Sequence, residues 1–291
     1  MNRFLLILVL TLCSLGSFAQ AKTENLDSLI DDILLTDREF EPLFTPDKSF
    51  HYLYLNANGN SATTYAGREI GDNQLNGSAQ LFYFNSWGLS LGLAGQMYAD
   101  ASPSYSSTVA SVGYGLSPKF ARGLYLRASY DRYFYASSDY VPTYNSAANL
   151  GASYRYKNFA SSLDASMLMG TETGFHFTWT NYAKFKLWNF KGGYLRVRPG
   201  VQLYFGQEDV EYAQTTALAG SWGSVFTEYV TQKELGLMNV QLRLPIELSY
   251  KGFDISVGYY YNIPRSLDSY YSYDKSSYFG ISIGYLLPLQ K

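Results

Sequence analysis

Residues 174–207 carry the sequence feature that most constrains the fold, a regular alternation of apolar and polar side chains on both sides of a short turn. Before the turn, Phe177 and Trp179 share one parity while Lys184 and Lys186 share the other. After the turn the alternation resumes in the segment YLRVRPGVQLYF. Successive residues of a strand point to opposite faces, so this hairpin has one apolar face and one polar, cationic face.

Similar segments, separated by turn residues, recur from residue 48 to the end of the sequence. They predict twelve strands, over residues 49–58, 74–84, 88–99, 107–117, 123–135, 146–156, 159–169, 174–187, 193–206, 239–250, 252–262 and 277–287. Short connections alternate with connections that are mostly longer. An even number of strands with short turns at one end and longer loops at the other is typical of outer-membrane barrels. The sequence therefore predicts an all-β fold, a twelve-stranded antiparallel transmembrane β-barrel over residues 48–291.

The amino-acid composition agrees with a barrel. The chain holds 29 Tyr, 18 Phe and 25 Gly, and only 16% of its residues are charged. Barrels combine an aromatic, apolar outer face with a lumen-facing set that stays polar, so they tolerate this mixture. The formal net charge of −2 indicates no nucleic-acid partner.

One residue departs from the strand pattern, and the aromatic residues near the strand ends agree with it. Arg132 falls on the apolar parity of its strand, where it would lie above the lipid or beside a β-bulge. Aromatic residues near the predicted strand ends, among them Phe82, Tyr83, Trp188 and Tyr278, fit the aromatic girdles found at membrane–water interfaces.

Residues 1–21 read as a secretory signal peptide, with Arg3 before an apolar run and small residues near the expected cleavage site. The alternative, a membrane-spanning helix, needs about 20 apolar residues, and this run is too short. The only cysteine, Cys13, lies within this segment. The mature chain is therefore expected to lack disulfides, thiolate metal sites and cysteine nucleophiles.

Residues 22–47 form a separate acidic leader in the periplasm. Eight acidic residues lie there against only Lys22 and Arg38, and apolar residues at helical spacing predict a short amphipathic helix over residues 25–35. One interpretation is a solvated periplasmic leader. The other is an acidic plug or docking helix that meets a basic barrel mouth or a periplasmic or outer-membrane partner.

The closing strand YFGISIGYLL, the alternating strands and the signal peptide ending SFAQ resemble a Gram-negative outer-membrane β-barrel, porin-like and of the Bacteroidetes type. In that class the last strand carries a sorting signal, and Gly280, Ile283 and Tyr285 match it. Here the chain continues through residues 288–291 instead of ending on an aromatic residue. The resemblance implies an outer-membrane location, contact with outer-membrane lipid and both termini in the periplasm.

The lumen-facing charges follow from the strand parity, and cations outnumber anions among them. Rings of Lys and Arg bias a pore toward anions, so one interpretation is an anion-favouring wall. The other is an internal salt-bridge network that braces the barrel. The expected pore-lining charges are Arg127, Asp131, Arg155, Asp164, Lys184, Lys186, Arg196, Arg198, Arg243, Glu247 and Asp254.

Like charges are expected to meet across one hairpin of this wall. If the turn pairs its strands symmetrically, Lys186 faces Arg196, and the next inward pair is again two cations. Like charges directly opposite each other destabilise a sheet. An acid on another strand (Asp164 or Glu247), water or a bound anion must then compensate.

Barrel size leaves the function open between two classes of protein. Eight strands leave a filled lumen and sixteen leave a channel, so twelve allow a narrow passage that one inserted segment could close. The acidic leader, or an inward-folding loop over residues 207–238, could do this, although that loop could equally be a surface lid. The first hypothesis is a passive pore for small solutes with a mild anion preference. The alternative is a closed barrel that serves as a structural or accessory subunit.

A surface hydrolase is a third hypothesis. Catalysis would need a histidine near a nucleophile or carboxylate, and the sequence has only His51 and His176. Neither has a Ser, Asp or Glu at a telling spacing. No catalytic residue, metal site or cofactor is therefore predicted.

Overall fold

The structure is a computed structural model that describes residues 51–69, 74–99, 105–118, 120–121, 123–136, 143–217, 225–268 and 271–289. The expected signal peptide and the leader over residues 22–47 lie outside the described residues. Within the described ranges, no helix is long and apolar enough to cross a membrane.

All regular elements of the described residues are β-strands. Most are ten or more residues long, and two of the barrel strands are each divided into two pieces. The bounds are β1 His51–Asn60, β2 Thr64–Tyr65, β3 Arg68–Glu69, β4 Asn76–Asn85, β5 Leu89–Tyr98, β6 Tyr105–Leu116, β7 Leu124–Tyr135, β8 Tyr144–Tyr156, β9 Phe159–Gly170, β10 Thr173–Ala183, β11 Phe185–Phe190, β12 Gly193–Val197, β13 Gly200–Ala217, β14 Val225–Tyr250, β15 Phe253–Pro264 and β16 Ser276–Pro288.

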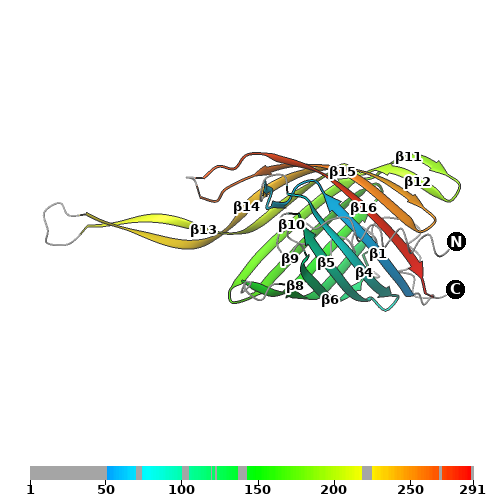
Figure 1. The fold of residues 1–291 in the computed structure, drawn as a ribbon, viewed down its shortest axis with the longest axis horizontal. Helices are drawn as coiled ribbons and strands as arrows, with labels where there is room; N and C mark the ends of the chain where they lie inside the picture. Colours follow the sequence, from blue (N-terminus) through cyan, green and yellow to red (C-terminus); the bar gives the residue numbers. More distant parts are fainter. Residues whose placement is uncertain are drawn as a thin grey trace.

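The strands close into one ring (Figure 1). Every barrel strand pairs with its neighbour antiparallel, and β1 pairs with both β4 and β16, so the sheet has no free edge at the join. β10 continues into β11 and β12 into β13, so the fourteen paired strands form twelve barrel strands, as predicted. The chain leaves the pairing near residues 198–199, where Pro199 has no N–H to donate to the ladder.

The short turns 86–88, 157–158, 191–192 and 251–252 lie at one end of the barrel, here called the short-turn end, and the two-residue connection 171–172 lies at the other. Residues 251–252 form a two-residue turn in which Lys251 and Gly252 have φ angles of 49° and 84°. Positive φ at both positions defines a type I′ turn, whose twist suits a hairpin. Tyr52 near the start of β1 pairs with Pro288 at the end of β16, so both ends of the ring lie at the short-turn end.

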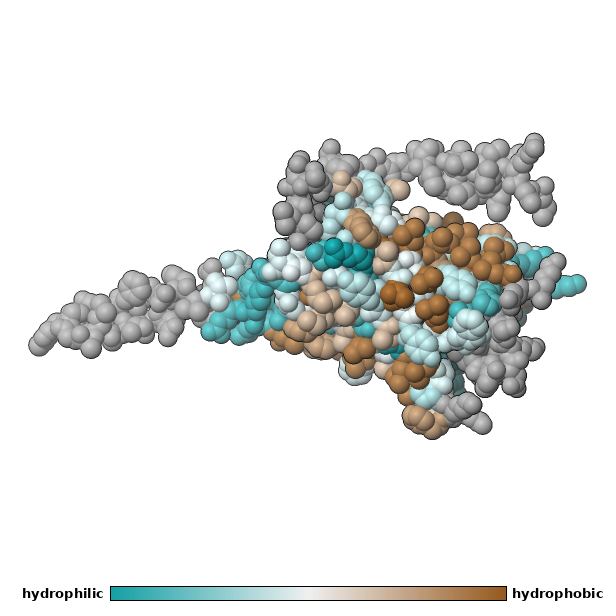
Figure 2. Space-filling model, turned by 90° about the horizontal axis from the view of Figure 1, so that it is seen from below, coloured by the Kyte–Doolittle hydropathy of each residue, from teal (hydrophilic) through white to brown (hydrophobic). Residues whose placement is uncertain are grey.

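The outer face is apolar and the inner face is largely polar. Neighbouring residues of one strand show the alternation, since Leu163 is 53% exposed whereas Ser162 and Asp164 are buried. Figure 2 shows apolar side chains gathered over the barrel wall, with hydrophilic residues at the base of the projecting hairpin. The outward set includes Leu55, Leu81, Leu93, Val112, Leu150, Leu163, Leu242, Leu244, Ile246, Val257, Ile281 and Ile283.

The girdle interpretation is wrong for some of the aromatic residues. Tyr83 and Trp188 do point outward, but Phe82 is only 1% exposed and Tyr278 is also buried. Phe82 has the opposite parity to Tyr83, so the pleat turns it into the lumen. There it joins an apolar cluster on one side of the barrel, formed by Tyr54, Phe82, Phe84, Ala94, Val109 and Tyr125 with Tyr52, Tyr133 and Leu286 packed against it.

The segment expected to be a loop over residues 207–238 is a long β-ribbon instead. β13 and β14 remain paired from Gln207↔Leu235 to Ala217↔Val225, with a register shift between Tyr204 and Phe205. The ribbon projects away from the barrel (Figure 1). Because hydrogen bonding between the two strands continues past the barrel wall, this segment does not fold into the lumen.

Arg132 lies outside the wall, and a β-bulge next to it supplies a partner. The β8–β9 pairing shifts register between Tyr144 and Ser146, which leaves Asn145 as the extra residue. Arg132 donates to the Asn145 side-chain oxygen at 2.9 Å. This contact gives the outward-facing guanidinium of Arg132 a hydrogen-bond acceptor.

Candidate functional site

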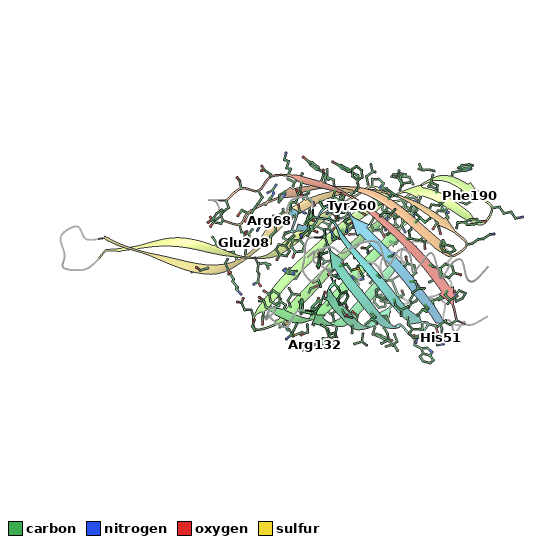
Figure 3. All side chains as sticks on the ribbon, viewed as in Figure 1. His51, Arg68, Arg132, Phe190, Glu208 and Tyr260 are labelled. Carbon is green, nitrogen blue, oxygen red and sulfur yellow. The ribbon has the colours of Figure 1, made fainter. Side chains whose placement is uncertain are left out.

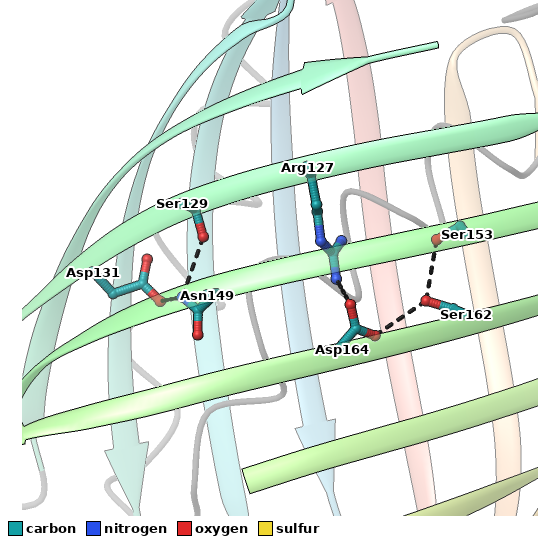
Figure 4. Close-up of polar contacts among 7 residues, drawn as sticks. All are labelled: Arg127, Ser129, Asp131, Asn149, Ser153, Ser162 and Asp164. Carbon is teal, nitrogen blue, oxygen red and sulfur yellow. Dashed lines mark hydrogen bonds and ion pairs between the residues drawn. The ribbon is translucent and has the colours of Figure 1, made fainter. Parts of the chain in front are cut away.

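One part of the lumen wall is braced by an ion pair between β7 and β9 (Figure 4). Arg127 donates to the Asp164 carboxylate, and Ser162 donates to its other oxygen at 3.1 Å. Ser153 extends the chain with a bond to Ser162, also at 3.1 Å. Gly151 lies between the two strands, where a Cβ would come within 2.4 Å of Arg127 Nε. The missing side chain lets the guanidinium lie flat against the wall.

A second polar group lies beside this pair, nearer the loop end of β7. Asn149 donates to Asp131 at 2.9 Å and to the hydroxyl of Ser129 at 3.1 Å, as Figure 4 shows. All three residues face the lumen. Asp131 is therefore held by the wall and is not directed toward the centre as an isolated charge.

Glu247 on β14 binds two arginines of the neighbouring barrel strand. It pairs with Arg196 in the β12–β14 register and accepts a bond from it, and Arg198 donates to its other oxygen at 2.7 Å. All three side chains are buried. Lys186 does lie directly opposite Arg196. The like charges of this hairpin therefore have a carboxylate beside them.

The other expected lumen charges also lie on inward parity. The ammonium groups of Lys184 and Lys186 lie 5.6 and 4.9 Å from tyrosine ring centroids, within cation–π range. Arg243 lies 5.4 Å from the Tyr260 ring. Arg155 and Asp254 are half-buried on the inward faces of β8 and β15.

A small hairpin lies across the loop end of the barrel. β2 and β3 are joined by Ala66 and Gly67, which have φ angles of 48° and 79°. A Cβ on Gly67 would lie 2.3 Å from the Asn239 side chain, so this turn rests against β14, three strands round the ring from β1. Ser276 on β16 donates to the Gly67 carbonyl at 2.8 Å. Residues 61–69, here called the lid, therefore reach from β1 across the mouth.

Arg68 holds the lid to the base of the projecting ribbon (Figure 3). Its guanidinium lies 2.7 Å from Glu208, donates to the Arg265 carbonyl at 3.0 Å and covers the Tyr273 ring at 3.7 Å from the centroid. Glu208 also accepts from the Leu267 N–H at 2.8 Å and the Tyr273 hydroxyl at 3.2 Å. We refer to Arg68, Glu208 and Tyr273 as the latch.

The latch is expected to respond to acid through Glu208. Burial alone would raise the pKa of Glu208, but hydrogen bonds from Arg68, Leu267 and Tyr273 and the charge of Arg68 outweigh it and lower the pKa. A lowered folded-state pKa means that the contribution is complete above the ordinary glutamate pKa and is lost as pH falls through the lowered value. We expect acidification through that range to loosen the lid.

The test is the current through the barrel between pH 7 and pH 3. Wild type should show larger current fluctuations at the acid end. Glu208→Gln should fluctuate at pH 7 as wild type does in acid, and Asp209→Asn, on the exposed neighbouring residue, should behave as wild type. A pH response that Glu208→Gln leaves intact would assign it to other carboxylates.

Beneath the lid lies a cavity of about 170 Å³. It is lined by residues of β1, β4, β5, β13, β14 and β16, and residues of the lid border it. None of its lining residues carries a charge. They are Asn58, Asn60, Ala62, Thr64, Ala66, Gly67, Asn76, Gly77, Ser78, Gln80, Gln96, Tyr98, Gln202, Tyr204, Asn239, Gln241 and Tyr278.

Sequence reasoning missed both the lid and this cavity. A signal was present, because Asn56, Asn58 and Asn60 repeat on the inward parity of the first strand and Gln80 and Gln96 follow on the next two.

The two histidines lie in different surroundings. His51 shares a hydrogen bond with the Tyr83 hydroxyl, and its ring lies 6.0 Å from that of Trp87 in the outer aromatic girdle. His176 is buried on the lumen side, with its ring 5.4 Å from the Tyr204 ring. Both contacts are with aromatic residues.

A closed ring of twelve antiparallel strands, an apolar outer belt and a polar lumen define a porin-like, outer-membrane β-barrel. No protein-family model matches the sequence, and no curated protein matches it. Among solved structures, the NanC porin aligns with a TM-score of 0.48 at 8% identity, over 79% of this chain and 98% of that one. The KdgM porin gives 0.43 at 10% identity, over 82% and 98%. An outer membrane channel from Pseudomonas putida F1 gives 0.38 at 10% identity, over 82% and 95%.

Proposed function

We propose that the protein is a narrow passive pore for small solutes with a mild preference for anions. The observation that carries this proposal is a lumen lined by polar and charged side chains, with seven cations and four anions among the inward charges named above. An excess of Lys and Arg raises the local concentration of anions. The preference is mild because carboxylates bind Arg127, Arg196 and Arg198.

The pore is oriented with its short turns and both chain termini in the periplasm, and the lid and ribbon face outward. This orientation follows the usual arrangement of outer-membrane barrels, in which periplasmic turns are short and external loops long. Solutes then enter past the lid and leave past the Glu247 group and the aromatic cluster. Solutes cross the pore by diffusion, and no catalytic step takes place.

Single-channel recording in planar bilayers tests the pore. Purified barrel should give discrete, ohmic current steps, and a salt gradient should give a reversal potential displaced modestly toward that of the anion. The recording is made with the chain from residue 22 and again from residue 48, which shows whether the leader blocks the lumen. Failure of both forms to conduct would remove the proposal.

The anion preference is tested at Lys184 and Lys186. Replacing both with Gln removes two positive charges without separating Glu247 from its arginines, so selectivity should move toward cations. The measurement is the reversal potential under a KCl gradient. Lys157→Gln, on a turn at the same end of the barrel, is the matched control and should leave the reversal potential unchanged. An unchanged potential in the double variant would remove the two lysines from the selectivity.

A closed accessory barrel is the second candidate, and one observation favours it. The cluster around Phe82 and Phe84 fills one side of the lumen with aromatic side chains. In that case residues 22–47 would dock on a periplasmic or outer-membrane partner. Absence of conductance together with co-purification of a partner that depends on residues 22–47 would support this alternative.

A further inference from the structure

Two buried acceptors border the cavity under the lid and lack partners. Gln80 is 7% exposed and Asn239 is 4% exposed, and both side chains line the cavity. Among the residues that the structure describes, neither Gln80 Oε1 nor Asn239 Oδ1 has a hydrogen-bond partner. A buried acceptor without a partner costs roughly 1–3 kcal/mol. These two residues lie on β4 and β14, which are separated in the ring by β1, β16 and β15.

The rest of the lining is already arranged by hydrogen bonds. Asn239 and Gln241 donate to the Asn262 oxygen at 3.0 and 2.9 Å, and Asn262 donates to Ser276 at 3.1 Å. Gln80 uses its own N–H group on Ser78 at 3.0 Å. The amide nitrogens of Gln80 and Asn239 are thus engaged within the wall, and the oxygens of these two residues remain as acceptors.

The chemistry of these groups restricts what can bind. Acceptors need donors, so the ligand must carry O–H or N–H groups. A cationic or anionic group would lie in the cavity without a charged partner, which is costly away from water. Tyr98, Tyr204 and Tyr278 add aromatic surface to the lining, and the Tyr278 ring is stacked on Tyr260 at 4.8 Å. Such rings pack well against C–H groups.

We propose that this cavity is a binding site for a small, neutral, polyhydroxylated solute, of the class of a single sugar unit or a sugar alcohol. The cavity of about 170 Å³ corresponds to roughly six water volumes. Hydroxyl groups of the solute bind Gln80 on β4 and Asn239 on β14, beneath the lid.

The inference deepens the proposed function by naming a solute class for the lumen, but binding can be measured without conduction. If the protein binds the solute but conducts no current, the proposed pore is wrong and the binding site stands. If it conducts current but does not bind the solute, the binding site is wrong and the pore stands. The two failures are therefore distinguishable.

Isothermal titration of the detergent-folded protein with glucose, and with gluconate as the charged counterpart, tests the proposal. Glucose should bind saturably, and gluconate at least tenfold more weakly. Gln80→Leu and Asn239→Leu should each weaken glucose binding at least tenfold. Gln232→Leu, on the exposed ribbon, is the matched control and should bind as wild type.

A variant in the lid tests the site without changing the barrel wall, so a loss of binding there cannot come from a misfolded wall. Thr64→Trp fills the cavity from the roof without altering a barrel strand, and it should abolish binding while the heat-modifiable mobility of the folded barrel is retained. No glucose binding by wild type, equal binding of gluconate, or unchanged binding in the Gln80 and Asn239 variants would each overturn the proposal. Those results would indicate that the cavity holds only water.

Discussion

Replacing Glu247 with Leu is expected to lower the free energy of unfolding by about 3 kcal/mol. The change leaves the guanidinium groups of Arg196 and Arg198 buried in the wall without the carboxylate that binds both. Removing one partner of a buried ion group is costly because the charges that stay are no longer compensated. The measurement is urea unfolding in lipid vesicles, followed by tryptophan fluorescence.

Two further variants separate the ion group from a general effect of the substitution. The triple variant Arg196→Met, Arg198→Met, Glu247→Leu removes all three charges and should recover most of the loss. Asp209→Leu, on the exposed part of β13, should change the free energy by less than about 0.5 kcal/mol. A Glu247→Leu protein as stable as wild type would mean that water in the lumen already screens the arginines.

Shortening the lid is expected to raise the single-channel conductance several-fold. Residues 62–73 would be replaced by a short Gly–Ser turn that joins β1 to β4. The lid reaches from β1 to Ser276 on the adjacent β16 and to Asn239 on β14, three strands round the ring, so its removal is expected to widen the mouth. The measurement is the conductance in symmetric KCl.

The projecting ribbon provides the matched control for the lid. Replacing residues 211–230 with a tight turn shortens β13 and β14 but keeps Glu208 and the barrel wall. Because the ribbon points away from the barrel (Figure 1), the conductance of this shortened variant should equal that of wild type. If shortening the lid changes nothing while shortening the ribbon raises the conductance, the constriction has been assigned to the wrong segment.

The barrel could be predicted from the sequence because the bilayer imposes a simple pattern. Each strand in the lipid needs an apolar outer face, so the period of two is visible in strand after strand and fixes both strand count and direction. The ribbon beyond the membrane is under no such constraint. Its residues, such as Glu208 and Asp209, give no apolar parity, so its pairing could not be distinguished from a loop.

Two errors have a similar origin. In the segment LFYF both parities are aromatic or apolar, and only Ser78 and Gln80, which share the parity of Phe82, indicate that Phe82 turns inward and Tyr83 outward. The lid strands are two residues each and show no periodicity. Their position depends on contacts between residues distant in the chain, above all Arg68 with Glu208.

The inward charges could be listed from parity, but their partners could not. Asp164 and Glu247 were equal candidates to compensate the cations of the 174–207 hairpin. The closed ring places Glu247 directly opposite Arg196, whereas Asp164 lies within reach of Arg127. The partner of each inward charge depends on which strands become neighbours in the ring and on the register of their pairing. The uncharged acceptors of the cavity gave no signal comparable to a charge.

The most direct test of the central claim, a water-filled lumen behind an apolar outer wall, is cysteine labelling during single-channel recording. The only natural cysteine lies in the expected signal peptide, so Ser256→Cys and Val257→Cys would each place one thiol in the mature barrel. Ser256 faces the lumen between Glu247 and Ser282, and its neighbour Val257 faces outward. A water-soluble, charged thiol reagent should reduce the current through Ser256→Cys and leave Val257→Cys unchanged. Equal labelling of both, or a current unaffected by modification at Ser256, would contradict it.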